Sequence, residues 1–161
     1  MATEITPATL TVTITESITL DGEARGGTVT QTIASVSEIA KRVMEVPITE
    51  IEIAKFQATN PGAGTFDEAD VKYIRLSNRD ATNHVVFVFT DDAATEFAIK
   101  VDAGNSIAFF GDNSGGVADW MVAKAAAITT VASTVAAGDL VTISAIADTA
   151  PVDIEYLIAG T

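Results

Sequence analysis

Hydrophobic and polar positions alternate from Leu10 to Leu20. A period of two residues predicts a half-buried β-strand, because successive side chains of a strand point to opposite sides. One side of this strand is aliphatic and the other carries hydroxyl groups: Leu10, Val12, Ile14, Ile18 and Leu20 oppose Thr11, Thr13, Thr15, Ser17 and Thr19. The glycine-rich residues 21–27 predict a turn, and the β-branched run Thr28 to Ala34 predicts the second strand of a hairpin.

The segment that follows, residues 36–46, fits two structures. Apolar residues recur there at helical spacing, with Ser35 or Ser37 as a suitable N-cap: Val36, Ile39, Ala40, Val43 and Met44. A strand through Lys41 to Val46 also fits, and the strands predicted on either side slightly favour it. Pro47 ends the element in both cases.

Short runs rich in β-branched and aromatic residues continue along the rest of the chain. Turn residues, chiefly Gly, Asn and Asp, separate them at intervals of roughly 8 to 12 residues. The further strands expected are Ile48–Phe56, Val71–Ser77, His84–Thr90, Glu96–Val101, Ser106–Phe110, Trp120–Ala127, Ile128–Val135, Leu140–Ala147 and Ile154–Ala159. This pattern predicts an all-β fold, a jelly roll or related antiparallel β-sandwich, with about nine to eleven strands.

The chain shows no internal repeat and no linker, so residues 10–161 are expected to form a single β-sandwich domain. Residues 1–9 are an N-terminal segment with two alternatives. The segment either belongs to a hairpin within the domain, the commoner outcome, or extends as an inter-subunit arm. An arm would pair with an exposed strand edge of a neighbouring subunit.

Composition adds a strongly acidic surface. The 161 residues hold 9 Lys and Arg against 22 Asp and Glu, a formal net charge of −13. Such a surface repels nucleic-acid phosphates and anionic lipid, so neither nucleic acid nor membrane is an expected partner. The apolar share of 48% and charged share of 19% indicate a folded chain rather than a disordered one. The absence of cysteine excludes disulfides, thiolate metal sites and a cysteine nucleophile.

No stretch predicts a leader or a membrane span. Residues 1–7 lack the basic and apolar regions of a secretory signal peptide. The richest apolar stretch, Met121 to Val141, is interrupted by Lys124 and by Gly138-Asp139, so it falls short of about 18 consecutive apolar residues. The sequence therefore predicts a soluble product of the cytosol in which it is made.

Candidate catalytic groups lack the neighbours that catalysis needs. His84 is the single histidine and begins an alternating strand, which favours a surface position over a Ser-His-Asp triad. Gly104 to Ala108 approximates the G-x-S-x-G elbow, but alanine replaces the second glycine and a strand is expected to follow. Paired carboxylates for glycoside hydrolysis meet only in three dimensions, and a single tryptophan argues against sugar platforms. We expect no enzyme activity and no catalytic residues.

Glycine-rich and acidic loops do not match known ligand motifs. Gly62-Ala63-Gly64 is followed by Asp67 where a phosphate-binding turn needs a third glycine. Three acidic clusters, Asp67-Glu68-Asp70, Asp91-Asp92 and Asp112-Asn113, offer oxygen ligands for Ca²⁺ but lack the EF-hand spacing. Solvated loop carboxylates are therefore expected. The sequence predicts no cofactor-binding or metal-binding residues and leaves calcium binding at an acidic loop open.

Residues 71–83, Val-Lys-Tyr-Ile-Arg-Leu-Ser-Asn-Arg-Asp-Ala-Thr-Asn, resemble a pattern found in virion structural proteins of tailed bacteriophages. In that pattern a strand of the type vkYiRltN leads into D-x-T-N. Two further passages are similar to such proteins: Leu20–Gly22 with Arg42–Pro47, and Lys100–Ile107. Together the passages cover about residues 20–110, with Arg79 where leucine is more familiar.

This resemblance implies a capsid cement (decoration) protein with a jelly-roll or related fold, often a trimer, located in the virion after synthesis in the host cytoplasm. Its partners would be further copies of itself and the major capsid protein or other virion proteins. A tail, neck or adaptor component is the alternative within the virion. A carbohydrate-binding β-sandwich is the alternative from another class, and it would need exposed aromatic side chains among Tyr73, Trp120 and Tyr156.

Overall fold

A computed structural model describes residues 5–57, 62, 64–92, 94–110 and 140–161. This part of the chain holds thirteen strands and no helix, which confirms the predicted all-β class. The strands divide between two compact units, one ending at Glu38 and the other running from Ile39 to Gly160. The sequence placed the boundary after Thr9, whereas the structure assigns the whole N-terminal hairpin to the first unit.

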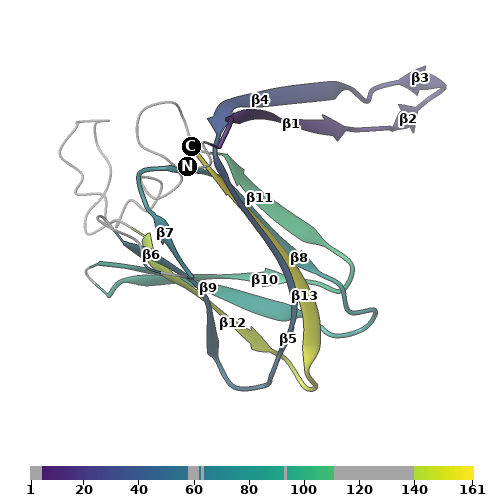
Figure 1. The fold of residues 1–161 in the computed structure, drawn as a ribbon. Helices are drawn as coiled ribbons and strands as arrows, with labels where there is room; N and C mark the ends of the chain where they lie inside the picture. The colour runs from purple at the N-terminus through teal and green to yellow at the C-terminus, as the bar shows by residue number, and fades with distance from the viewer. Residues whose placement is uncertain (1–4, 58–61, 63, 93, 111–139) are drawn as a thin grey trace, which may run out of the picture. The chain divides into compact units, whose positions relative to one another are not determined.

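The first unit is an antiparallel two-stranded ribbon (Figure 1). β1 pairs with β4, and β2 pairs with β3 at the tip; the strands are β1 (Ala8–Thr15), β2 (Thr19–Leu20), β3 (Glu23–Ala24) and β4 (Thr28–Val36). Asp21 and Gly22 connect β2 to β3 with positive φ angles of 51° and 82°, as in a type I′ hairpin turn. The predicted hairpin is confirmed, with its tight turn confined to these two residues.

The second unit is a sandwich of two sheets (Figure 1). One sheet has the strand order β10-β9-β12-β6-β7 and the other has the order β11-β8-β13-β5. Their bounds are β5 (Glu38–Val46), β6 (Ile51–Gln57), β7 (Thr65–Asp67), β8 (Val71–Asn78), β9 (Val85–Asp91), β10 (Glu96–Val101), β11 (Ser106–Phe110), β12 (Leu140–Ala147) and β13 (Val152–Gly160). β6 and β7 pair in parallel.

The order of these strands is that of a jelly roll. When the short strand β7 is set aside, the first strand of the unit lies beside the last, and the second beside the second-last. The nested neighbours are β5 with β13, β6 with β12, β8 with β11, and β9 with β10. A long hairpin rolled into two sheets produces this nesting, which is the double Greek key of a jelly roll.

Alternation along each sandwich strand determines which side faces the core. In β9, Val85, Phe87 and Phe89 are buried, while the residues between them are half-buried. The core takes side chains from both sheets, which interdigitate between the two layers. Its largest fully buried members are Phe56, Phe87, Ile74, Leu76, Leu140, Ile143, Ile154, Ile158, Val46, Val85 and Val152.

The segment that fitted two structures is a strand. β5 covers Glu38–Val46, so the alternative favoured by the neighbouring strands is correct. Ala40 and Met44 pack against the core, whereas Ile39 and Val43 are exposed. The apolar residues that matched helical spacing therefore lie on both sides of a strand, and only one side meets the core.

Other strand predictions differ from the structure in number. β2, β3 and β7 were not predicted, because strands of two or three residues are too short to show alternation. The described residues consequently contain thirteen strands rather than about nine to eleven. The predicted strands Trp120–Ala127 and Ile128–Val135 lie outside the described residues.

Candidate functional site

The ribbon of β1 and β4 has two chemically different faces. Cross-strand partners in an antiparallel pair place their side chains on the same face. On what we call the threonine face, Thr11 lies opposite Thr32, Thr13 opposite Thr30, and Thr15 opposite Thr28. On what we call the aliphatic face, Leu10 lies opposite Ile33, Val12 opposite Gln31, and Ile14 opposite Val29.

The aliphatic face is open to solvent over much of its length. Ile14 is 49% exposed and Val29 is 66% exposed, although Ile33 is buried. Toward the tip, Ile18 and Leu20 add exposed aliphatic groups. An isolated two-stranded ribbon is marginally stable in water, and contiguous exposed apolar groups mark interaction surfaces. The ribbon therefore presents a surface suited to contact with another molecule.

The tip of the ribbon combines aliphatic groups with a carboxylate. Leu20 lies opposite Glu23 in the β2–β3 pair, so the two side chains share a face. Ile18 precedes Leu20 by two residues and projects to the same side of the extended chain. The Arg25 N–H donates a hydrogen bond of 2.9 Å to the Ile18 carbonyl, which continues the ladder. Ile18, Leu20 and Glu23 are called the tip face below.

In the sandwich, a buried carboxylate gathers three cations on the outer side of the four-stranded sheet. The side chain of Glu155 in β13 is 9% exposed, and its Oε1 lies 2.5 Å from Arg75 Nη2 of β8. Its Oε2 lies 3.3 Å from Arg79 Nη1 and 3.4 Å from Lys41 Nζ of β5. Three positive charges against one negative charge leave a local surplus of two (3 − 1), in a chain whose net charge is −13. We call these four residues the Glu155 cluster.

The Glu155 cluster borders a polar pocket of about 310 Å³. Ser77 and Ser106 line it, and the Ser106 hydroxyl donates a hydrogen bond of 2.8 Å to the Ser77 Oγ. Arg75 Nε is buried and has no hydrogen-bond partner among the described residues. A buried donor without a partner costs about 1–3 kcal/mol, so this surface favours an approaching anion.

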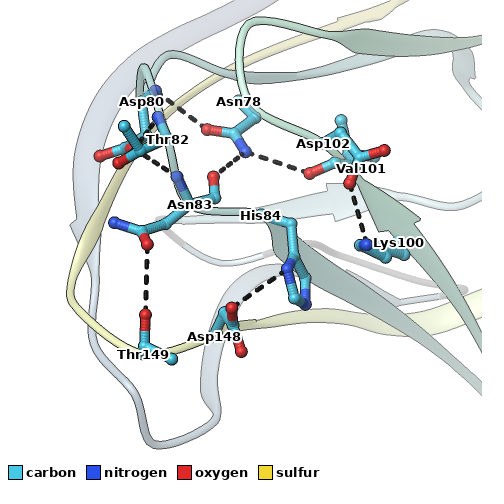
Figure 2. A network of polar contacts seen from close by, with 10 residues as sticks. All are labelled: Asn78, Asp80, Thr82, Asn83, His84, Lys100, Val101, Asp102, Asp148 and Thr149. Atoms are coloured by element: carbon cyan, nitrogen blue, oxygen red, sulfur yellow. Dashed lines mark hydrogen bonds and ion pairs between the residues drawn. The ribbon is translucent and has the colours of Figure 1, made fainter.

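The polar residues of the phage-like motif build the loop between β8 and β9 (Figure 2). The Asn78 amide donates to the Asn83 carbonyl at 2.9 Å and to the Val101 carbonyl at 3.0 Å, which ties the loop to β10. Asp80 Oδ1 accepts hydrogen bonds of 2.7 Å from the Asn83 and Thr82 N–H groups. These bonds, the Asn83 bond first, hold the pKa of Asp80 below its ordinary value. The motif thus performs a structural task.

Aromatic residues do not form an exposed platform in the described structure. Tyr73 and Tyr156 are both buried. The Tyr73 ring packs 5.3 Å from the Phe110 ring, and burial raises the pKa of Tyr73 against the opposing effect of Arg75. Trp120 lies outside the described residues. The carbohydrate-binding alternative therefore receives no support from either tyrosine.

The residues considered for catalysis make separate contacts. His84 Nδ1 lies 3.3 Å from Asp148 Oδ2 (Figure 2), whereas the Ser106 hydroxyl donates to Ser77. Ser106 begins β11, so the elbow-like stretch leads into a strand, as the sequence predicted. The described hydrogen bonds thus join each residue to a partner outside the proposed triad.

The acidic loops satisfy backbone groups. Asp67 Oδ1 accepts a hydrogen bond from the Ala69 N–H at 3.1 Å, and Asp91 Oδ1 accepts one from the Thr95 N–H at 2.6 Å. Within the described ranges, no three or more acidic, histidine or cysteine side chains are grouped to hold a metal ion. The cluster Asp112-Asn113 lies outside those ranges.

Sequence reasoning missed the Glu155 cluster, because its members come from distant parts of the chain. A signal was present in two strands. Arg75 and Glu155 interrupt otherwise apolar runs, and both fall on the side of the strand that alternation turns away from the core. Opposite charges within two apolar strands would have predicted a paired ion network if the strands had been known to be neighbours.

Comparison with known proteins gives little guidance. No family model matches this chain, and no curated protein matches it. A solved structure described as Bacillus endospore appendages, a novel family of disulfide-linked pili, is similar over 77% of this chain and 85% of its own. Its sequence identity is 15% and its TM-score is 0.44. In the described part of the chain, no helix has the length and apolar character to cross a membrane.

Proposed function

We propose that this protein is a non-enzymatic structural protein of a tailed-bacteriophage virion, a cement protein that stabilises the capsid as a homotrimer. The observation that carries the proposal is the ribbon of β1 and β4, whose aliphatic face is exposed on Ile14 and Val29. A strand pair with one aliphatic face and one hydroxyl face is suited to a partner that covers the aliphatic side.

Assembly would supply the missing cover. Fully burying a Val, Leu or Ile side chain contributes about 1.5–3 kcal/mol. The exposed side chains of Ile14, Ile18, Leu20 and Val29 therefore offer several kcal/mol to each contact before the costs of association are subtracted. On a capsid lattice these modest contacts are repeated, so avidity replaces strong single contacts.

The remaining features suit such a role. The jelly roll supplies a rigid body without disulfides, since the chain has no cysteine. A net charge of −13 keeps exposed strands apart before assembly. The proposed partners are other copies and the major capsid protein or another virion protein, after synthesis in the host cytoplasm. The resemblance at residues 71–83 favours the phage virion over other assemblies.

The aliphatic face provides a direct test. We expect Ile14→Thr combined with Val29→Thr to abolish trimer formation and binding to undecorated capsids, because the substitutions keep β propensity but remove the apolar surface. Thr13→Ser combined with Thr30→Ser is the matched control on the opposite face and should retain both properties. Light scattering measures the oligomer, and co-sedimentation measures capsid binding.

Each outcome decides between the proposed roles. A wild-type protein that stays monomeric and never co-sediments with capsids would contradict the cement assignment. Larger closed rings would instead indicate the tail, neck or adaptor alternative, because those components form rings around an axis rather than local trimers. Equal loss in both double variants would show that the aliphatic face has no special part in assembly.

A further inference from the structure

We propose that the tip face of one copy docks on β5 of a second copy, beside the Glu155 cluster. This inference rests on the proposed assembly role and names the surfaces that meet. The donor is the tip face of Ile18, Leu20 and Glu23. The acceptor, here called the acceptor strip, consists of Ile39, Lys41 and Val43 on β5.

The acceptor strip is an outward-facing row on an edge strand. β5 ends the sheet order β11-β8-β13-β5. Ala40 and Met44 pack against the core, so alternation turns the strip to the outer side. Ile39 is 58% exposed and Val43 is 56% exposed, and the Lys41 side chain between them is 56% exposed.

The two surfaces are complementary in charge and in apolar character. The tip face carries two exposed aliphatic side chains and the Glu23 carboxylate. The acceptor strip carries two exposed aliphatic side chains and the Lys41 ammonium. Arg79, whose side chain is 55% exposed, adds a second accessible cation through the Glu155 cluster.

The local positive surplus makes this position selective. A chain with 22 acidic and 9 basic residues repels an acidic tip over most of its surface. Three of those nine basic residues, Lys41, Arg75 and Arg79, surround the single carboxylate of Glu155. A carboxylate arriving from another copy therefore finds unneutralised charge at this position.

The tip cannot reach the strip of its own chain, however the two units are oriented. The ribbon places Glu23 about 40 Å from Val36, since thirteen residues separate them (36 − 23) at about 3.3 Å each. Lys41 lies five residues beyond Val36 (41 − 36), so it is at most about 17 Å from it. The two side chains of one chain are thus separated by at least about 20 Å, and a second copy must supply the contact.

A tip-to-strip contact joins different surfaces of two copies, so it is a heterologous interface. Such an interface forms a closed ring when its rotation divides a full turn, and an open filament otherwise. Three copies related by a threefold axis would satisfy every tip and every strip. The contact therefore explains how a homotrimer would close without an isologous surface.

Cysteine cross-linking tests the contact cleanly because the chain has no cysteine. Full-length Glu23→Cys and Lys41→Cys variants are mixed under mild oxidation, and the disulfide-linked heterodimer is measured by non-reducing electrophoresis. We expect about tenfold more heterodimer than in the control mixture of Glu23→Cys with Lys100→Cys, because docking raises the effective concentration of the paired thiols. Lys100 is a matched control, since its side chain is also 56% exposed.

A charge exchange supplies the second measurement. Glu23→Lys alone and Lys41→Glu alone should each lose self-association in light scattering, and mixing the two should restore it in part. Circular dichroism checks that each variant is folded, since Lys41 also pairs with Glu155. If Lys41→Glu fails to fold, Lys41→Cys still tests the contact through cross-linking.

The outcomes separate this inference from the proposed function. Equal cross-linking in the test and control mixtures, with normal association of the unmodified chain, would overturn the tip-to-strip contact alone. A chain that stays monomeric at every concentration and on capsids would overturn the assembly role as well. A faster-migrating monomer in the double variant Glu23→Cys with Lys41→Cys would indicate an intramolecular contact and would also overturn the inference.

Discussion

The ribbon and the sandwich use the same alternation of apolar and polar residues, but they differ in what covers the apolar side. Phe87 in β9 is 0% exposed between two sheets, whereas Val29 in β4 is 66% exposed. Alternation establishes which side chains share a side of a strand. Whether that side becomes a core depends on a second layer, and within the ribbon no described strand provides one.

The polar sides of the two regions differ as well. The ribbon uses neutral hydroxyl groups, with Thr28 Oγ1 3.5 Å from Thr15 Oγ1 across the strands. The outer side of the sandwich instead holds the Glu155 cluster. Threonine favours the extended backbone through its branched side chain. It therefore supports a ribbon that has little packing of its own, whereas the packed sandwich can hold a buried ion pair.

The largest expected effect separates a covered apolar residue from an uncovered one. Phe87→Ala should lower the free energy of unfolding by about 3–5 kcal/mol, because it leaves a cavity between the sheets. Val29→Ala should change the free energy of unfolding of the monomer by less than about 0.5 kcal/mol. Urea unfolding measures both values, and similar losses would show that the ribbon is packed as tightly as the sandwich.

An intermediate effect is expected at the buried carboxylate. Glu155→Gln should lower the free energy of unfolding by roughly 1–3 kcal/mol, because Arg75, Arg79 and Lys41 lose their shared partner. Lys100→Gln, which removes an exposed pair with Asp102, should cost less than about 1 kcal/mol. Urea unfolding compares the two, and equal costs would mean that burial adds nothing to the cluster.

Removal of the ribbon should affect the sandwich less. We expect residues 39–161 to retain the β spectrum of the sandwich by circular dichroism and to unfold cooperatively. The free energy of unfolding should lie within about 1 kcal/mol of the full-length monomer, since the core of the second unit comes from its own strands. An unfolded fragment would contradict the independence of the two units.

The smallest effect concerns acid stability of the β8–β9 loop. The folded-state pKa of Asp80 lies below its ordinary value, because the Asn83 and Thr82 N–H groups bind the carboxylate. Its contribution to stability is therefore present above about pH 4 and is lost as the pH falls through the folded-state pKa. Asp80→Asn should flatten that part of the stability curve, measured by urea unfolding between about pH 5 and 2. An unchanged acid slope would contradict this role.

Local patterns predicted much of the fold and the wrong kind of site. The hairpin, the strand at residues 38–46 and the jelly-roll class agree with the structure, because alternation and turn residues act within a few residues. The tests of His84 and the Gly104–Ala108 stretch looked for chemistry within single motifs. The Glu155 cluster instead joins residues as far apart as Lys41 and Glu155.

The sequence by itself determined the all-β class, the two faces of the ribbon and the acidic surface, since these depend on residue type and on a period of two residues. Only the tertiary structure decided that the aliphatic face of the ribbon stays exposed and that three cations meet at Glu155. Both features depend on which strands become neighbours in the two sheets. Strand order is set by packing across the whole chain, and alternation along one strand carries no information about it.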